Sequence, residues 1–142
     1  DLNNAADFPL KADLVTCLET LEHVGQIGAA IRNLKSMLNP GAVLLISVPI
    51  ESGVLGAIKY FVKTRMFGYS FSEISEDPRQ QKMYEKDLLM NRDVSKFRND
   101  REGWGTHFGF DYRRVEEILH REFPDVNAWT AGLTRFFMVK NQ

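Results

Sequence analysis

Cysteine is almost missing from this chain, which has a single one, Cys17, among 142 residues. One thiol excludes an internal disulfide and is typical of proteins from a reducing compartment. Long apolar runs are also absent, since none approaches the roughly 18 residues of a membrane-spanning helix. No signal-peptide pattern opens the sequence. We therefore expect a cytoplasmic protein.

Charge of one sign is not in excess either. The chain has 18 Lys and Arg residues against 19 Asp and Glu residues, a formal net charge of -1. This balance gives no overall attraction to nucleic acid or to an anionic membrane, and we expect neither as a partner. With 44% hydrophobic residues, the composition is that of one ordinary globular domain.

Glycine is scattered rather than clustered. The ten glycines form no G-x-G-x-x-G turn, and none of them precedes Gly25. In Rossmann-type folds such a turn, between a first strand and a first helix, cradles the nucleotide part of a cofactor. We therefore expect the 142-residue chain alone to bind a cofactor of this kind weakly or not at all.

What the sequence does contain is a strand, helix, strand pattern over residues 12–49. A short apolar strand is predicted at residues 13–18, and an amphipathic helix at residues 25–38 has apolar positions three and four apart. Asn39, Pro40 and Gly41 are expected to end that helix. A second apolar strand follows at residues 42–48. Unbroken apolar strands of this kind are typical of a parallel sheet covered on both faces.

The next segment, residues 52–104, contains no convincing strand. Helices are predicted over residues 54–62 and 78–97, the first with Lys59, Lys63 and Arg65 on its solvent side. Because the segment follows the end of a strand, we interpret it as a lid over the mouth of a site. The alternatives are a solvated decoration or a homodimer contact made by its aromatic residues.

The last part of the chain returns to a mixed pattern. A helix is predicted over residues 110–123 with Asp111 as its N-terminal cap, and two short strands at residues 126–130 and 135–140. Ala131 and Gly132 between them indicate a hairpin. The overall prediction is therefore an α/β fold, with a core formed by residues 12–49 and 106–142 and a helical insertion between them.

Two carboxylates and an imidazole, Glu19, Glu22 and His23, come directly after the first strand. If a helical turn begins there, side chains three and four residues apart converge on one side. Oxygen and imidazole ligands so placed could hold a divalent cation. A histidine could instead act as a general base, and a purely structural role is the third interpretation.

The segment from Asp13 to Pro49 resembles the second half of class I S-adenosylmethionine-dependent methyltransferases. The resemblance rests on a strand and turn of the form D-V-x-x-x-E-x-L-E-H followed by L-x-P-G-G and a strand ending at proline. The matching residues are Asp13, Leu14, Val15, Glu19, Leu21, Glu22, His23, Leu38, Pro40, Gly41 and Pro49. Ala42 replaces the second glycine. The resemblance implies the C-terminal part of a Rossmann-like sheet, mostly parallel with an antiparallel last strand.

The resemblance also implies S-adenosylmethionine as cofactor and a place for it. Asp1 falls near the acidic position that such enzymes use at the adenine, and a chain beginning there would be a fragment of a methyltransferase domain. Cys17, Leu18 and Glu19 stand at the strand end that contacts the cofactor in the family. Cys17 is equally well explained as a core residue.

The E-x-x-E-H turn is similar to the metal motif of two methyltransferase families. One O-methylates polyprenylated catechols in ubiquinone synthesis, and the other methylates the terminal ribose 2′-hydroxyl of small RNAs. In the second family a later histidine completes the site, and His107 stands at the corresponding position here. The resemblance therefore implies Glu19, Glu22, His23 and His107 as metal ligands, with His23 and His107 as catalytic candidates.

The function expected from these residues is S-adenosylmethionine-dependent methyl transfer to an oxygen of a small molecule. Basic residues such as Arg98 and Arg101 alternate with acidic ones, which argues against an RNA acceptor. A non-catalytic methyltransferase-like domain that binds a partner or scaffolds an assembly is the alternative. A nicotinamide dehydrogenase half-domain shares the sheet but does not explain the E-x-x-E-H turn.

Overall fold

A four-stranded sheet with strand order β1-β2-β4-β3 forms the centre of the molecule. The computed structural model describes residues 2, 10–98 and 107–142. The strands are β1 (Ala12–Leu18), β2 (Leu38–Pro49), β3 (Asp125–Ala131) and β4 (Thr134–Lys140). β1 and β2 are parallel, whereas β4 is antiparallel to both of its neighbours. The α/β class and the antiparallel last strand are confirmed.

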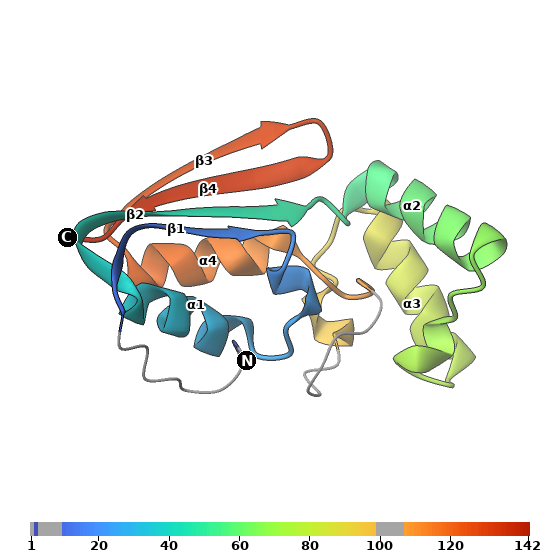
Figure 1. The fold of residues 1–142 in the computed structure, drawn as a ribbon. Helices are drawn as coiled ribbons and strands as arrows, with labels where there is room; N and C mark the ends of the chain where they lie inside the picture. The colour runs from blue at the N-terminus through green and yellow to red at the C-terminus, as the bar shows by residue number, and fades with distance from the viewer. Residues whose placement is uncertain (1, 3–9, 99–106) are drawn as a thin grey trace.

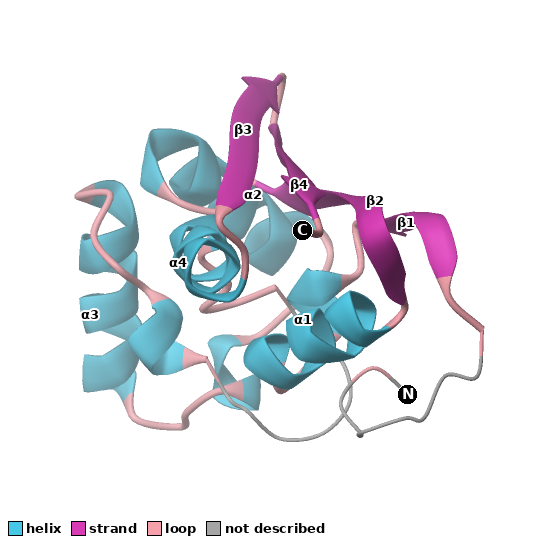
Figure 2. Cartoon of the chain, turned by 90° about the vertical axis from the view of Figure 1, so that its left-hand side faces the viewer, coloured by secondary structure: helices cyan, strands magenta, loops and turns pink. Residues whose placement is uncertain are grey.

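The main core lies between this sheet and two helices that cover one of its faces. α1 (Ile27–Ser36) and α4 (Tyr112–Glu122) lie side by side below the strands in Figures 1 and 2. In β2 the side chains of Leu44 and Ile46 are fully buried, and their register partners in β4, Val139 and Phe137, are buried with them. Register partners share a face of the sheet, so these pairs form the apolar surface on which α1 and α4 pack.

The boundary between α1 and β2 differs from the predicted one. The predicted helix over residues 25–38 ends at Ser36, and β2 already begins at Leu38, so Asn39, Pro40 and Gly41 belong to the strand. Backbone bonds explain the early start, because the Ala12 amide donates to the Met37 carbonyl and the Gly41 amide donates to Asn141. The predicted cap of α4 is confirmed, since the Asp111 carboxylate accepts from the Arg113 amide.

A second unit, which we call the helical unit, follows β2. It contains α2 (Gly53–Met66), α3 (Pro78–Leu89) and the 3₁₀ turns η2 (Phe71–Glu73) and η3 (Ser95–Phe97). The unit lies beyond the C-terminal end of β2 in Figure 1 and has its own aromatic core. The predicted helix over residues 78–97 ends at Leu89, because the chain reverses at Asn91 with φ of +52°. Asn tolerates this left-handed conformation better than most residues.

The orientation of α2 reverses the predicted one. The apolar positions expected to be buried, Val54, Leu55, Ile58, Phe61 and Val62, are exposed, and Gly56, Ala57 and Tyr60 face the core of the helical unit. Small residues at the contact let α2 approach α3 and the chain after β2 closely: a Cβ on Gly56 would lie 2.3 Å from the Glu51 carbonyl oxygen and 3.3 Å from the Leu88 side chain. Within the residues described, no helix has both the length and the apolar character that crossing a membrane requires.

Two neighbouring leucines of α3 test this account of the helical unit. Leu88 is 1% exposed in its core, whereas Leu89 is 53% exposed on the same helix. We expect Leu88→Ala to lower the free energy of unfolding in urea by about 2–5 kcal/mol, because it removes buried methyl groups and leaves a cavity. Leu89→Ala is the matched control and should cost less than about 0.5 kcal/mol. Equal losses in the two variants would contradict the packing described.

Candidate functional site

The C-terminal ends of β1 and β2 lie side by side, with Leu18 opposite Ser47. Immediately after β1, the Glu19 amide donates to the Ser47 carbonyl (3.0 Å) and lies 3.2 Å from its hydroxyl oxygen. The same hydroxyl donates to the Glu19 carboxylate at 3.0 Å. Glu19 has φ of +46°, an uncommon conformation for a residue with a side chain. Ser47 therefore holds a strained backbone turn where β1 ends, two residues before the end of β2, and this turn leads into the 3₁₀ turn η1 (Leu21–His23).

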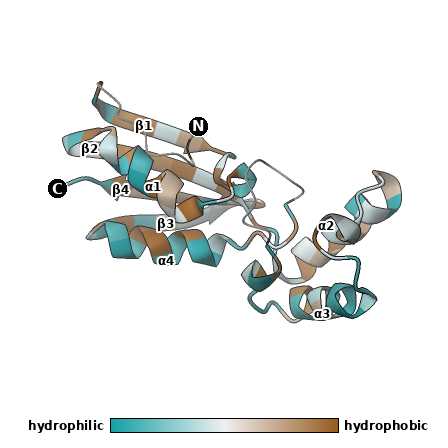
Figure 3. Cartoon of the chain, turned by 90° about the horizontal axis from the view of Figure 1, so that it is seen from below, coloured by the Kyte–Doolittle hydropathy of each residue, from teal (hydrophilic) through white to brown (hydrophobic). Residues whose placement is uncertain are grey.

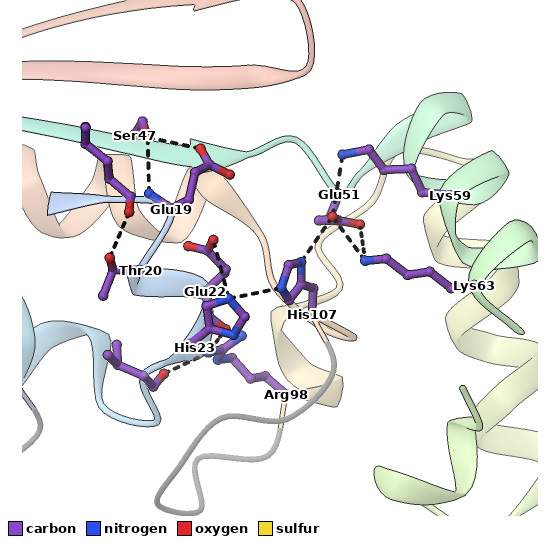
Figure 4. Close-up of polar contacts among 12 residues, drawn as sticks. Glu19, Thr20, Glu22, His23, Ser47, Glu51, Lys59, Lys63, Arg98 and His107 are labelled. Carbon is purple, nitrogen blue, oxygen red and sulfur yellow. Dashed lines mark hydrogen bonds and ion pairs between the residues drawn. The ribbon is translucent and has the colours of Figure 1, made fainter. Parts of the chain in front are cut away.

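Three side chains converge just below these strand ends, as Figure 4 shows. Glu22 and His23 come from η1, and His107 comes from the segment before α4. The two histidines face each other with their Nε2 atoms 3.3 Å apart, and His23 Nε2 lies 3.8 Å from a Glu22 oxygen. One ligand atom from each residue lies within 4.8 Å of the others. We call these three residues the Glu-His-His cluster.

The Glu22 carboxylate is the buried member of this cluster. Its side chain is 1% exposed, and its Oε2 atom has no hydrogen-bond partner among the described residues. A buried carboxylate oxygen without a partner is costly unless a proton or a cation satisfies it. The Arg98 guanidinium fixes the turn beneath it by donating to the carbonyl oxygens of Glu22 (2.8 Å) and Val24 (2.7 Å).

Glu51 joins the cluster to the helical unit. It lies just beyond β2, is 8% exposed, and has a carboxylate oxygen 3.3 Å from His107 Nδ1. Lys59 and Lys63 of α2 lie 3.5 Å and 3.3 Å from the same oxygen. A carboxylate accepts a hydrogen bond but cannot donate one. The contact with Glu51 therefore places a proton on Nδ1 of His107, and the lone pair on its Nε2 atom faces the Glu-His-His cluster.

Burial and neighbouring charges shift the pKa values of three of these groups. Burial raises the pKa of the Glu22 carboxyl, and the charge on Glu19 adds to that effect. Burial also lowers the pKa of His23, as do the charges of His107 and Arg98. Burial works to raise the pKa of Glu51, but the His107 hydrogen bond and the two lysines outweigh it and hold the pKa below its usual range. The lowered pKa favours the neutral form of His23, which is the form that binds a metal or accepts a proton.

The structure places the predicted site residues in different surroundings. Glu22, His23 and His107 come together, whereas the helical turn begins at Leu21 and the Glu19 carboxylate accepts a hydrogen bond from Ser47. Asp1 lies outside the described residues.

The two predicted cofactor residues at the end of β1 line a hollow beside that strand. Cys17 is buried in the main core, and burial raises the pKa of its thiol, whereas Leu18 is 51% exposed. The hollow has a volume of about 400 Å³, and its lining is apolar apart from the side chains of Thr16, Cys17 and Thr20. This volume and lining fit an aromatic base. They offer no charged group to the amino-acid part of S-adenosylmethionine, so the described residues fit only part of that cofactor.

Sequence reasoning missed Ser47 and Arg98 as site residues. Ser47 is the only hydroxyl in the apolar run of residues 43–48, and a lone polar residue near the end of a buried strand is a usable signal. Arg98 gave no such signal, because its partners are backbone carbonyls 74 and 76 residues away in sequence.

Most of the chain matches one family model, and shorter or weaker similarities are found to individual proteins. A family model described as a methyltransferase domain matches residues 1–115. Over 45 residues the chain is 38% identical to a ubiquinone biosynthesis O-methyltransferase of Proteus mirabilis (strain HI4320), which is 32% of this chain and 18% of that protein. A solved structure of an O-methyltransferase family protein from Burkholderia thailandensis superposes with a TM-score of 0.48 and 13% identity, covering 94% of this chain and 31% of that chain. The chain thus spans less than a third of either relative's length.

The strand-end turn can be tested through Ser47. Ser47→Ala removes the hydroxyl that bonds the Glu19 carboxylate, and we expect the free energy of unfolding to fall by about 1 kcal/mol. Ser36→Ala is the control, because that exposed hydroxyl only bonds a carbonyl one turn back in α1. Its cost should stay within about 0.5 kcal/mol. Chemical denaturation of the three proteins measures the difference, and a Ser47→Ala variant as stable as the control would refute this role.

Proposed function

The chain belongs to the methyltransferase-domain family, and from this premise we propose that it provides the acceptor side of an S-adenosylmethionine-dependent methyltransferase. We propose further that the methyl group goes to an oxygen atom of a small molecule. One observation carries the proposal: a buried carboxylate and two facing imidazoles meet at the common end of two parallel strands. In open α/β sheets, ligands bind at this edge.

The chemistry required at the acceptor is the removal of a proton. A hydroxyl group is a weak nucleophile at neutral pH and needs a base or a cation beside it. Neutral His23 has the protonation state of a base, and the contact of His107 with Glu51 orients the second imidazole toward it. When bound, S-adenosylmethionine would supply a methyl group on a positively charged sulfur, and Cys17, Leu18 and Thr20 would hold its base.

We propose a divalent cation as the partner of the Glu-His-His cluster. Two observations support this proposal: the Glu22 oxygen has no hydrogen-bond partner in the part of the chain that the structure describes, and the two Nε2 atoms lie 3.3 Å apart. The two imidazoles of this donor set suit a borderline ion such as Zn²⁺, and the carboxylate also suits a harder ion such as Mn²⁺. Such an ion would lower the pKa of an acceptor hydroxyl. Without an ion, the same residues still provide a base, so methyl transfer does not depend on this part of the proposal.

We also propose that the helical unit is a lid. Its α2 starts two residues after Glu51, and two of its lysines hold the carboxylate that contacts His107. A change in the position of α2 would therefore act on the cluster through Glu51. Lids of this kind exclude water from the reacting atoms.

Methyl transfer is tested with the full-length product of the gene, S-adenosylmethionine and a simple catechol. We expect S-adenosylhomocysteine and an O-methylated product, and none from an aromatic amine of the same size. His23→Ala and His107→Ala should each lower kcat about 10²–10⁴-fold, the usual contribution of a positioned base. His120→Ala, a substitution of an exposed histidine on α4, is the control and should leave kcat unchanged.

Calorimetric titration of the full-length gene product with S-adenosylhomocysteine separates the outcomes of that assay. Binding without transfer to any hydroxyl compound would favour the non-catalytic, partner-binding alternative. Failure to bind S-adenosylhomocysteine at all would overturn the proposal.

Cation binding is tested on the 142-residue chain by titration with Mn²⁺, followed by electron paramagnetic resonance of the free ion. We expect Glu22→Gln and His107→Ala each to weaken binding by at least about tenfold, since each removes a ligand. The His120→Ala control should bind Mn²⁺ as the parent chain does. If the parent chain and His107→Ala bind equally, or neither binds, the cation has no place in the cluster and the histidines act as bases.

A further inference from the structure

A cavity of about 430 Å³ opens where α1, η3 and α4 meet. Figure 3 shows α1 and α4 in front of the sheet, each with hydrophilic segments among apolar ones. The described residues that line the cavity include four arginines and one lysine but a single carboxylate. Because the whole chain has a formal net charge of -1, this excess of positive charge is local. The charged lining residues are Arg32, Lys96, Arg98, Arg114, Arg121 and Glu122.

These cations come from three separate parts of the chain. Arg32 lies on α1, Lys96 on η3, and Arg98 just after that turn. Arg114 and Arg121 lie two turns apart on α4 and therefore on one face of the helix. Along the sequence the basic residues alternate with acidic ones, so only the folded chain brings these five together.

Neighbouring carboxylates cancel only part of this charge. Lys96 is closely paired, with Asp87 at 2.6 Å, but Arg114 contacts a glutamate of its own helix at 3.1 Å in an exposed pair that water screens. Arg98 donates to two backbone carbonyls, and these bonds orient its guanidinium without changing its charge. Arg121 makes no ion pair with any described residue. Arg114 and Arg121 are therefore open to an anionic ligand.

The first turn of α1 forms one wall of the cavity. Gly25, Gly28 and Ala29 have little or no side chain there, so a ligand can approach the backbone. The side chain of Gln26 does not cap the helix, and its first turn contains no acidic residue. Amide groups at the start of a helix favour negative charge, which adds to the attraction of the five cations.

We propose that this cavity binds a small molecule that carries a diphosphate group. Guanidinium groups match the oxygens of phosphate in bidentate pairs, and four of the five lining cations are arginines. The volume is in the range of cavities that hold whole small molecules, which is more room than one phosphate needs. Glu122, the last residue of α4, would repel a polyanion that continued past it, so a nucleic acid strand fits this site less well.

Arg98 connects this cavity to the Glu-His-His cluster. Its guanidinium donates to the carbonyl oxygens of Glu22 at 2.8 Å and Val24 at 2.7 Å, and it also lines the cavity. A bound diphosphate would therefore contact the residue that fixes the turn below the strand ends. Binding here requires neither the cofactor nor the methyl acceptor, so it can be measured apart from methyl transfer.

The experiment is calorimetric titration of the 142-residue chain, and of the full-length gene product, with inorganic pyrophosphate in the absence of divalent cations. We expect one pyrophosphate to bind per chain, more tightly than inorganic phosphate does. Binding should weaken as salt is added, because the attraction is electrostatic.

Three variants locate the site. Arg121→Gln should weaken pyrophosphate binding about tenfold, because a hydrogen bond between two charged groups is lost. Glu122→Gln removes the lining carboxylate and should strengthen binding severalfold. Arg65→Gln changes an exposed arginine on α2 and is the control, which should bind as the parent does. Unaltered circular dichroism melting of each variant shows that it is folded.

Absence of pyrophosphate binding by both proteins overturns the proposal, as does equal binding by the parent, Arg121→Gln and Arg65→Gln. Two further probes test the source of the phosphate: an RNA of about 20 nucleotides and vesicles of phosphatidylglycerol. If either binds more tightly than pyrophosphate and loses that binding in Arg121→Gln, the ligand is a nucleic acid strand or a lipid headgroup, and the small-molecule proposal is wrong.

Discussion

The parallel pairing of β1 with β2 is the constraint on which the candidate site depends. It brings Leu18 opposite Ser47, so that two segments nearly thirty residues apart end at one edge of the sheet. Glu19 then adopts a left-handed conformation that its side chain disfavours, held by bonds to the backbone and hydroxyl of Ser47. Strained residues of this kind persist only where the surroundings fix them. The turn at Glu19 changes the direction of the chain, so that Glu22 and His23 lie below the strand ends and do not continue the line of β1.

Glu51 carries this local arrangement into the rest of the molecule. It follows β2, contacts a histidine from the segment before α4, and is held by lysines of α2. One buried carboxylate thus joins the end of β2 and the segment before α4 to α2, which belongs to the helical unit and not to the main core. A second connection lies nearby, where the Gly109 amide donates to the Tyr84 hydroxyl of α3 at 3.4 Å. A Cβ on Gly109 would lie 2.6 Å from the Arg98 amide nitrogen, so this crossing requires glycine.

Much of the fold could be predicted from sequence because its signals are local. Apolar runs and helical spacing located all four strands and α1, α2 and α4 to within a few residues. The predictions that failed concern positions where contacts with residues distant in sequence decide the structure. Residues 38–41 belong to a strand because of two backbone hydrogen bonds, from the Ala12 amide to Met37 and from the Gly41 amide to Asn141. Ala12 and Asn141 are distant in sequence and reach these positions only in the folded chain. The pairing of His107 with His23 was expected only through the family resemblance, since 84 residues separate them. The role of Arg98 had no sequence signal of any kind.

The reversed orientation of α2 shows why apolar spacing alone cannot assign a buried face. A helix packs where its contact is closest, and Gly56 and Ala57 allow a closer approach than Ile58 or Phe61 would. Once that narrow face is packed on α3, the lysines that would otherwise extend into solvent reach Glu51, and the large apolar side chains have no partner within the described chain. The same geometry therefore produces the ion pairs that hold the site and the exposed apolar face.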